Sequence, residues 1–190
     1  MNKLQIFCLI VLATTLVSQL NAQNPEEGDK APLFTATNDH GEKWLLKDHL
    51  GSNYIVLFFY PAAMTGGCTK QACAFRDNAK AFEEEGAVVA GISGDDVENL
   101  PLFKEAHGLN FDLLSDPKGE IAKSYGVPLR DGGSLVRTIN GKDFTLNREV
   151  TTARWTFVIN KEGEIIYKNT DVKVEEDPAN VLAAIKTDKN

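Results

Sequence analysis

The chain has 190 residues, of which 43% are hydrophobic and 25% charged, and its formal net charge is −7. These values are typical of one globular domain with a core of its own. The acidic balance argues against nucleic acid or an anionic membrane surface as the main partner.

The first 23 residues differ in character from the remainder. Lys3 is their one charged side chain, and a mainly apolar stretch, 4–17, is followed by a polar segment that ends at Ala22. This order is typical of a secretory signal peptide. The alternative is an uncleaved membrane anchor, but the apolar run is shorter than the ~20 residues that a helix needs to cross a bilayer.

The expected domain organisation follows from this signal. We predict that residues 1–22 are cleaved, taking Cys8 with them, and that residues 23–190 form a single domain. The mature protein is expected to be exported, to the periplasm or out of the cell, without stable membrane insertion. Cys68 and Cys73 then remain in an oxidising compartment, where disulfides persist.

The first part of the domain begins with strand patterns. Short strands are predicted at 34–37 and 43–46, on either side of a turn made of Asn, Asp, His and Gly. Residues 54–59 are a continuous apolar and aromatic run, which is typical of a central strand buried on both faces. A helix is predicted over 68–85, because apolar residues recur at three- and four-residue spacing until Gly86.

The alternation of strands and helices continues through the middle of the chain. A buried strand is predicted at 87–93, followed by a helix over 97–107. A short strand at 111–114 leads into a helix that runs from 115 to about 125. Residues 126–152 are rich in Gly, Asn and Asp, and they predict irregular structure, a long loop with room for a hairpin.

The last part of the chain completes the fold prediction. A hairpin is predicted from 155–159 and 164–168, and a closing helix over 177–186 starts with Pro178 in its first turn. This order of elements predicts an α/β protein with a central mixed β-sheet flanked by helices, a three-layer α/β/α sandwich.

The segment Pro61-Ala-Ala-Met-Thr-Gly-Gly-Cys68 follows the predicted central strand and brings a cysteine to the start of a helix. Helix N-terminal amides and the helix dipole favour the thiolate, which is the nucleophilic form of cysteine. Thr65 offers a hydroxyl one turn earlier, and Gly66 and Gly67 leave room for a small substrate. Pro61 fixes the turn and shields the sulfur. The segment therefore predicts an accessible nucleophilic cysteine.

Cys73 follows five residues after Cys68. In an intact helix their Cα atoms would be ~8.6 Å apart, whereas a disulfide requires about 4.4–6.8 Å. The pair is therefore either never bonded or bonds only when the first helical turns unwind. On spacing alone, a structural disulfide that closes a surface loop stays open as an alternative. A metal pair is disfavoured, because the sequence shows no accompanying cluster of His or Cys residues.

The stretch of residues 59–77 resembles the active-site segment of the peroxiredoxins, which are AhpC/TSA-like peroxidases of thioredoxin fold. More narrowly, it is similar to the bacterioferritin-comigratory-protein or peroxiredoxin Q branch. The signature Pro-x-x-x-Thr-x-x-Cys falls on Pro61, Thr65 and Cys68, and the continuation Cys-Thr-Lys-x-Ala-Cys ends at Cys73.

The resemblance extends over about residues 26–187 and includes Arg154 in an Arg-x-Thr-Phe match. One position departs from the branch, which usually has Thr-Pro-Gly-Cys where this chain has Gly66 before Gly67. A glycine in place of proline loosens the turn, so we expect the chemistry to survive and local unfolding to be easier.

The resemblance implies a thioredoxin-like fold and a thioredoxin-dependent peroxidase of the atypical two-cysteine type, without a cofactor or a metal. Cys68 would be the peroxidatic cysteine, which attacks hydrogen peroxide or an organic hydroperoxide and becomes a sulfenic acid. Cys73 would be the resolving cysteine, which forms an intramolecular disulfide with Cys68 after the helix unwinds. Thr65 would bind the peroxide oxygens, and Arg154 would stabilise the thiolate and the transition state.

The implied partners are a hydroperoxide substrate and a thioredoxin-like reductant protein. Because an exported protein cannot use cytosolic thioredoxin directly, we expect this reductant to be an envelope protein. The implied assembly is a monomer or a weak homodimer. Two functions of another class remain as alternatives, a secreted protein for thiol–disulfide exchange and a non-enzymatic domain with a structural disulfide.

Overall fold

The computed structural model describes residues 24–190. The predicted signal peptide, 1–22, lies outside these residues. Within the described part of the chain, no helix is long and apolar enough to cross a membrane.

A seven-stranded mixed sheet forms the centre of the molecule, in the order β2-β1-β5-β4-β3-β8-β9. Strands β3, β4 and β5 are parallel, and β8 pairs with β3 in the antiparallel direction. The strands are β1 (Thr35–Asn38), β2 (Lys43–Leu45), β3 (Tyr54–Phe59), β4 (Ala87–Ser93), β5 (Asp112–Ser115), β8 (Trp155–Ile159) and β9 (Ile165–Asn169). The predicted mixed sheet is confirmed, and β3 and β4 have the predicted bounds.

Strand β3 lies inside the sheet and is buried along its whole length. Its side chains alternate between the two faces, so that Ile55, Leu57 and Phe59 enter one core cluster while Val56 and Phe58 enter the other. This double burial is why the strand reads as an uninterrupted apolar run in the sequence.

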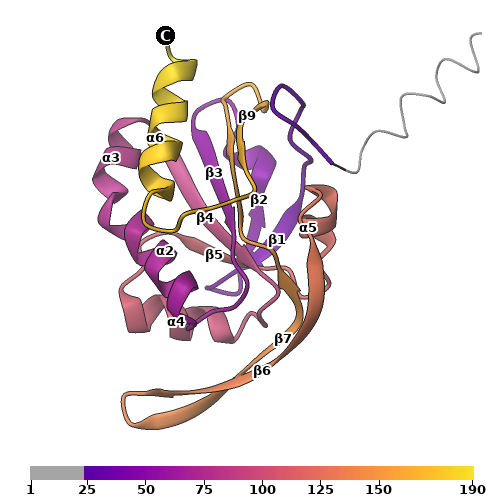
Figure 1. Cartoon of the computed structure of the whole chain (residues 1–190), viewed down its shortest axis with the longest axis vertical. Coiled ribbons are helices and arrows are strands. Elements are labelled where there is room, and N and C mark those ends of the chain that lie inside the picture. The colour runs from indigo at the N-terminus through magenta and orange to yellow at the C-terminus, as the bar shows by residue number, and fades with distance from the viewer. Residues whose placement is uncertain (1–23) are drawn as a thin grey trace, which may run out of the picture.

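Helices cover both faces of the sheet, as Figure 1 shows. Helices α2, α3, α4 and α6 supply the core residues on the side of Val56 and Phe58, and α5 packs on the opposite side. Their bounds are α2 (Gly66–Asp77), α3 (Ala79–Glu84), α4 (Asn99–His107), α5 (Glu120–Ser124) and α6 (Asp177–Asp188), and a short 3₁₀ helix spans Leu46–Asp48. The three-layer arrangement agrees with the prediction.

The single helix predicted over 68–85 is wrong, because the structure divides it into α2 and α3. The break lies at Asn78, whose backbone leaves the helical region at φ −99° and ψ 9°. Its side-chain amide donates to the Ala74 carbonyl, which competes with the helical hydrogen bonds. The helix predicted after 115 is also shorter than expected, since Asp116 to Gly119 form a turn and α5 begins only at Glu120.

Residues 126–152 are much more regular than predicted. They form a long two-stranded hairpin of β6 (Leu129–Ile139) and β7 (Lys142–Thr152), which Figure 1 shows extending beyond the body of the domain. Its glycines obscured the strand pattern, but Gly132 is required there because a Cβ atom would come within 2.1 Å of the Arg148 carbonyl oxygen. A close approach of two backbones, rather than a loop, explains this glycine.

Candidate active site

Cys68 occupies the third position of α2, directly after the loop that leaves β3. The first hydrogen bond of the helix runs from the Thr69 amide to the Thr65 carbonyl, at 2.8 Å. The amides of Gly66, Gly67 and Cys68 precede this bond and have no acceptor inside the helix. These free amides give the first turn of α2, which carries Cys68, the partial positive charge of a helix N-terminus.

Arg154 completes the surroundings of the sulfur from a distant part of the chain. It lies between β7 and β8, and its Nη2 donates to the Cys68 Sγ at 3.3 Å. The Cys68 side chain is only 1% exposed, but both glycines before it are on the surface. The structure thus brings the sequence-predicted residues Cys68 and Arg154 together, directly beneath the exposed backbone of Gly66 and Gly67.

The two glycines have different surroundings. A Cβ atom at Gly67 would lie 3.3 Å from the Arg154 Nη2, whereas one at Gly66 would meet nothing within 4 Å. A side chain at 67 would therefore press on the guanidinium that contacts Cys68. The space at 66 is open, so contacts in this structure do not explain a glycine there.

Thr65 is the residue that precedes α2, and its hydroxyl donates to the Ala62 carbonyl at 2.9 Å. The oxygen of this hydroxyl keeps its lone pairs free to accept a hydrogen bond from a substrate. Pro61 is partly exposed at the start of the same loop. The structure places both predicted residues on the loop that leads to Cys68.

Two hydrogen bonds from the β6–β7 hairpin hold the backbone of this loop. The Thr152 hydroxyl donates to the Tyr60 carbonyl at 2.9 Å, and the Arg137 Nε donates to the Met64 carbonyl at 2.9 Å. Met64 has a positive φ of 60°, a costly conformation for this residue type that such outside contacts maintain. Arg137 and Thr152 belong to the hairpin, so the hairpin positions the active-site loop.

Asp95 holds the same loop from beneath. Its Oδ2 accepts the Ala63 amide at 2.8 Å and the Ser93 hydroxyl at 2.7 Å. Burial raises the pKa of the Asp95 carboxyl, and the hydrogen bonds from Ala63 and Ser93 partly offset the increase. Sequence reasoning missed this residue, because Asp95 and Asp96 stand next to each other just before a predicted helix, where acidic side chains are usually solvated.

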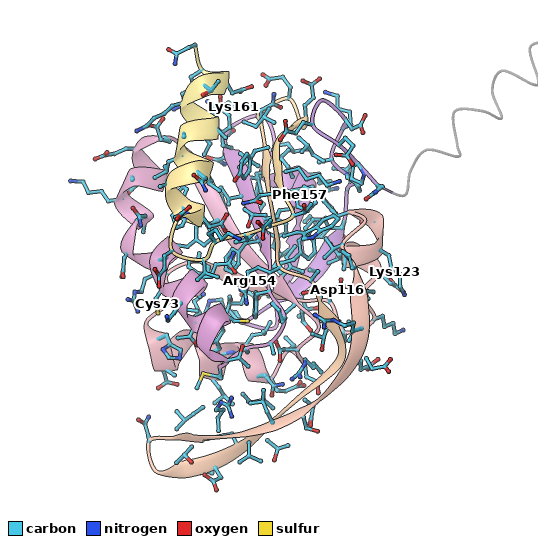
Figure 2. The ribbon with its side chains drawn as sticks, viewed as in Figure 1. Cys73, Asp116, Lys123, Arg154, Phe157 and Lys161 are labelled. Carbon is cyan, nitrogen blue, oxygen red and sulfur yellow. The ribbon has the colours of Figure 1, made fainter. Side chains whose placement is uncertain are left out.

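Cys73 lies further along α2, and the helix between it and Cys68 is intact. Both thiols are free, with Cys68 buried and Cys73 partly exposed. Figure 2 shows Cys73 near the outer edge of the molecule and Arg154 nearer its middle. The structure therefore represents a reduced state in which the two sulfurs belong to separate environments.

A buried polar group behind Arg154 was not predicted from the sequence. Arg154 Nη1 donates to Gln71 Oε1, Gln71 Nε2 donates to Asp177 Oδ2 at 2.8 Å, and Thr156 Oγ1 donates to the same oxygen at 2.8 Å. Gln71, Thr156 and Asp177 are each 0% exposed. A signal was present in the sequence, since Gln71 falls on the apolar side of α2, one turn after Cys68.

Comparison with known proteins agrees with this site. The AhpC/TSA family model matches residues 27–168. Peroxiredoxin Bcp of Bacillus subtilis is 40% identical over 161 residues, which cover 85% of this chain and 95% of that protein. The chloroplastic peroxiredoxin Q of Oryza sativa subsp. japonica is 37% identical over 155 residues, which cover 82% of this chain and 64% of that protein.

Solved structures give the same assignment. Peroxidoxin BcpB from Mycobacterium tuberculosis superposes with a TM-score of 0.72 at 34% identity, over 86% of this chain and 98% of that one. The bacterioferritin comigratory protein of Xanthomonas campestris, described in connection with its alkyl peroxide reduction activity, has a TM-score of 0.68 at 26% identity, over 83% and 92%. These neighbours make the fold thioredoxin-like. The chain therefore belongs to the AhpC/TSA family and, within it, to the peroxiredoxins.

Proposed function

We propose that this protein, a thiol-dependent peroxidase by its family, uses Cys68 as its peroxidatic cysteine and reduces hydrogen peroxide and organic hydroperoxides. The observation that carries the proposal is the 3.3 Å contact between Arg154 Nη2 and Cys68 Sγ at the start of α2. The guanidinium and the free helix amides favour a thiolate there, and the exposed glycines let a small substrate approach.

In the first step the Cys68 thiolate attacks one oxygen of the hydroperoxide. The S–O bond forms while the O–O bond breaks, so that sulfur is oxidised to a sulfenic acid and the leaving oxygen takes up a proton to become water or an alcohol. In this proposal Thr65 and the Cys68 amide bind the peroxide oxygens, and Arg154, which contacts the Cys68 sulfur, stabilises the developing charge. Pro61 shapes the loop that carries Thr65.

In the second step Cys73 resolves the sulfenic acid. Its sulfur attacks the Cys68 sulfur, the S–O bond breaks, and water leaves as an intramolecular disulfide forms. Helical geometry keeps the two Cα atoms beyond disulfide range, so the turns between them must unwind first.

Two contacts that hold α2 lie beyond Cys73 and limit how far the helix unwinds. Phe75 is buried and stacks on Phe58 of β3 with ring centroids 4.8 Å apart. Arg76 Nη1 donates to the His107 carbonyl of α4. Because these contacts follow Cys73 in the chain, unwinding can be confined to the turns before them.

A thioredoxin-like protein with two thiols would return the enzyme to its reduced state by accepting the disulfide. We propose that residues 1–22 are a cleaved signal, that 23–190 is the mature domain, and that the reductant is an envelope protein. Mass spectrometry of the protein from its native host tests the cleavage. Sedimentation of the reduced and oxidised forms tests the proposed monomer or weak homodimer.

The test of the chemistry is a thiol count after a single turnover. Reduced protein mixed with one equivalent of hydrogen peroxide should lose both thiols, whereas Cys73→Ser should lose one and hold a sulfenic acid. If Cys68→Ser consumes peroxide as fast as the unchanged protein, the proposal is wrong. Rapid reduction of insulin by the protein would instead favour thiol–disulfide exchange on proteins.

A further inference from the structure

A continuous polar chain links the proposed peroxidatic sulfur to the C-terminal helix. It runs from Cys68 Sγ through Arg154 and Gln71 to the carboxylate of Asp177, and Asp177 is the first residue of α6. Thr156 of β8 donates to the same carboxylate oxygen as Gln71 does, each at 2.8 Å. The contacts join α2, β8 and α6 behind the reacting sulfur.

The orientation of the Gln71 amide decides whether this chain can form. An amide has a donor end and an acceptor end, and only the acceptor end is useful to a guanidinium. In the observed orientation Oε1 faces Arg154 and Nε2 faces Asp177. The reverse orientation would point an NH₂ group at the guanidinium and a carbonyl oxygen at the carboxylate. An acceptor at position 177 is therefore what selects the useful orientation.

Asp177 is an unusual residue to find in the core. Its side chain is 0% exposed, and its Oδ1 has no hydrogen-bond donor among residues 24–190. Burial raises the pKa of its carboxyl, and the hydrogen bonds from Gln71 and Thr156 and the positive charge of Arg154 partly offset this. An acidic residue needed only to begin α6 could remain in solvent, as Glu176 does. The buried placement indicates that the carboxylate serves the groups it contacts.

We propose that Asp177 is a positioning residue for the peroxidase reaction, which fixes the Gln71 amide so that Gln71 holds Arg154 against the Cys68 sulfur. This inference rests on the proposed role of Cys68. It also has a consequence for the second step. Gln71 lies between Cys68 and Cys73 in α2, so unwinding these turns pulls Gln71 away from Asp177. The same contact therefore stabilises the reduced, helical state.

The experiment compares Asp177→Leu, which removes the acceptor, with Asp177→Asn, which retains one. Two readouts are taken for each: the single-turnover rate with hydrogen peroxide, and the rate at which iodoacetamide alkylates Cys68 at neutral pH in a Cys73→Ser background, which reports the thiolate fraction. Asp177→Leu is expected to lower the peroxide rate by about 10- to 100-fold, because Arg154 is misplaced, and to slow alkylation. Asp177→Asn is expected to recover most of both rates.

A stability control comes from the same helix. Ile185→Val removes one buried methyl group of α6, so it lowers the melting temperature without touching the polar chain. It is expected to leave both rates unchanged. If Asp177→Leu behaves like Ile185→Val, or if Asp177→Asn is as slow as Asp177→Leu, the inference is overturned.

A second pair of variants keeps the test informative if Asp177→Leu does not fold. Gln71→Glu alone brings two carboxyl groups together and should slow the peroxide reaction. Adding Asp177→Asn supplies a new donor to Glu, with the Thr156 hydroxyl turning to accept from the Asn amide, and should restore the rate. If the two substitutions instead lower the peroxide rate additively, the inference is contradicted. Failure of the proposed function is recognised separately, because Cys68→Ser would then still consume peroxide.

Discussion

Gly66→Pro is the substitution that most directly tests the unwinding step. Gly66 is the first residue of α2, a position that favours proline because the amide there precedes the first helical hydrogen bond. Thr65 before it has φ −103° and ψ 150°, the extended conformation that a residue preceding proline prefers. A Cβ atom at 66 would meet nothing within 4 Å. The folded helix should therefore accept proline without strain.

The size of the effect follows from chain entropy. Glycine costs about 0.5–1 kcal/mol more than alanine to order, and proline removes a further ~0.4–1 kcal/mol of unfolded-state freedom at a compatible site. Together these terms stabilise the intact helix by about 1–2 kcal/mol, which lowers the unwound population about 5- to 30-fold. Disulfide formation should slow by this factor, since Cys73 reaches Cys68 only in the unwound state. The reaction of Cys68 with peroxide should change little.

Rapid mixing with one equivalent of hydrogen peroxide separates the two steps, with acid quenching and alkylation of the remaining thiols. A slower second step also leaves the sulfenic acid exposed for longer, so Gly66→Pro should be converted to sulfinic acid at lower peroxide concentrations. Gly66→Ala should fall between glycine and proline. The neighbouring Gly67→Ala should act on the other step, because its Cβ atom presses on Arg154 at 3.3 Å. Disulfide formation in Gly66→Pro at the rate of the unchanged protein would refute this reasoning.

Substitutions at three further residues test the site itself. Arg154→Lys should slow the single-turnover peroxide reaction by about 10²–10³-fold, because one ammonium cannot contact both the Cys68 sulfur and Gln71. Thr65→Val should lower kcat/KM for hydrogen peroxide by a similar factor, whereas Thr65→Ser should retain activity through its hydroxyl. Burial raises the pKa of the Asp95 carboxyl, so the folded protein binds a proton at Asp95 more tightly than the unfolded chain does. The folded protein therefore loses stability as pH rises through the raised pKa of the folded state. Urea unfolding over a pH series should therefore show Asp95→Asn gaining stability relative to the unchanged protein as pH increases. If the difference between their free energies of unfolding does not change with pH, the raised pKa of Asp95 is contradicted.

The sequence was sufficient for the parts of the fold in which local pattern and tertiary environment agree. Strands β3 and β4 are buried on both faces, so their apolar runs give both their existence and their bounds. The hairpin within 126–152 was anticipated, but not the length and regularity of β6 and β7, because their Gly, Asn and Asp residues resemble loop composition and Gly132 is there for close backbone packing. The break at Asn78 was not predicted, because an apolar spacing compatible with one helix continues across it.

For the site, the sequence predicted the residues whose chemistry is evident from a local motif or a family match. Cys68 and Thr65 belong to one segment, and Arg154 entered only through the resemblance. Gln71 and Asp177 could not be found in this way. Their meaning depends on a contact between residues 106 positions apart, which only the folded chain reveals.

Two features of the site have opposite effects on the stability of the first turns of α2. The contact between Gln71 and Asp177 ties the helix to α6, whereas Gly66 adds backbone freedom at the point where the helix begins. Position 67 has no such freedom to vary, because a side chain there would displace Arg154. Gly67 is thus explained by space in the reduced state, and Gly66 by the entropy of the unwound state. The glycine that differs from the usual proline of the branch is therefore best understood as favouring the resolving step, with the buried carboxylate limiting how often the helix opens before peroxide has reacted.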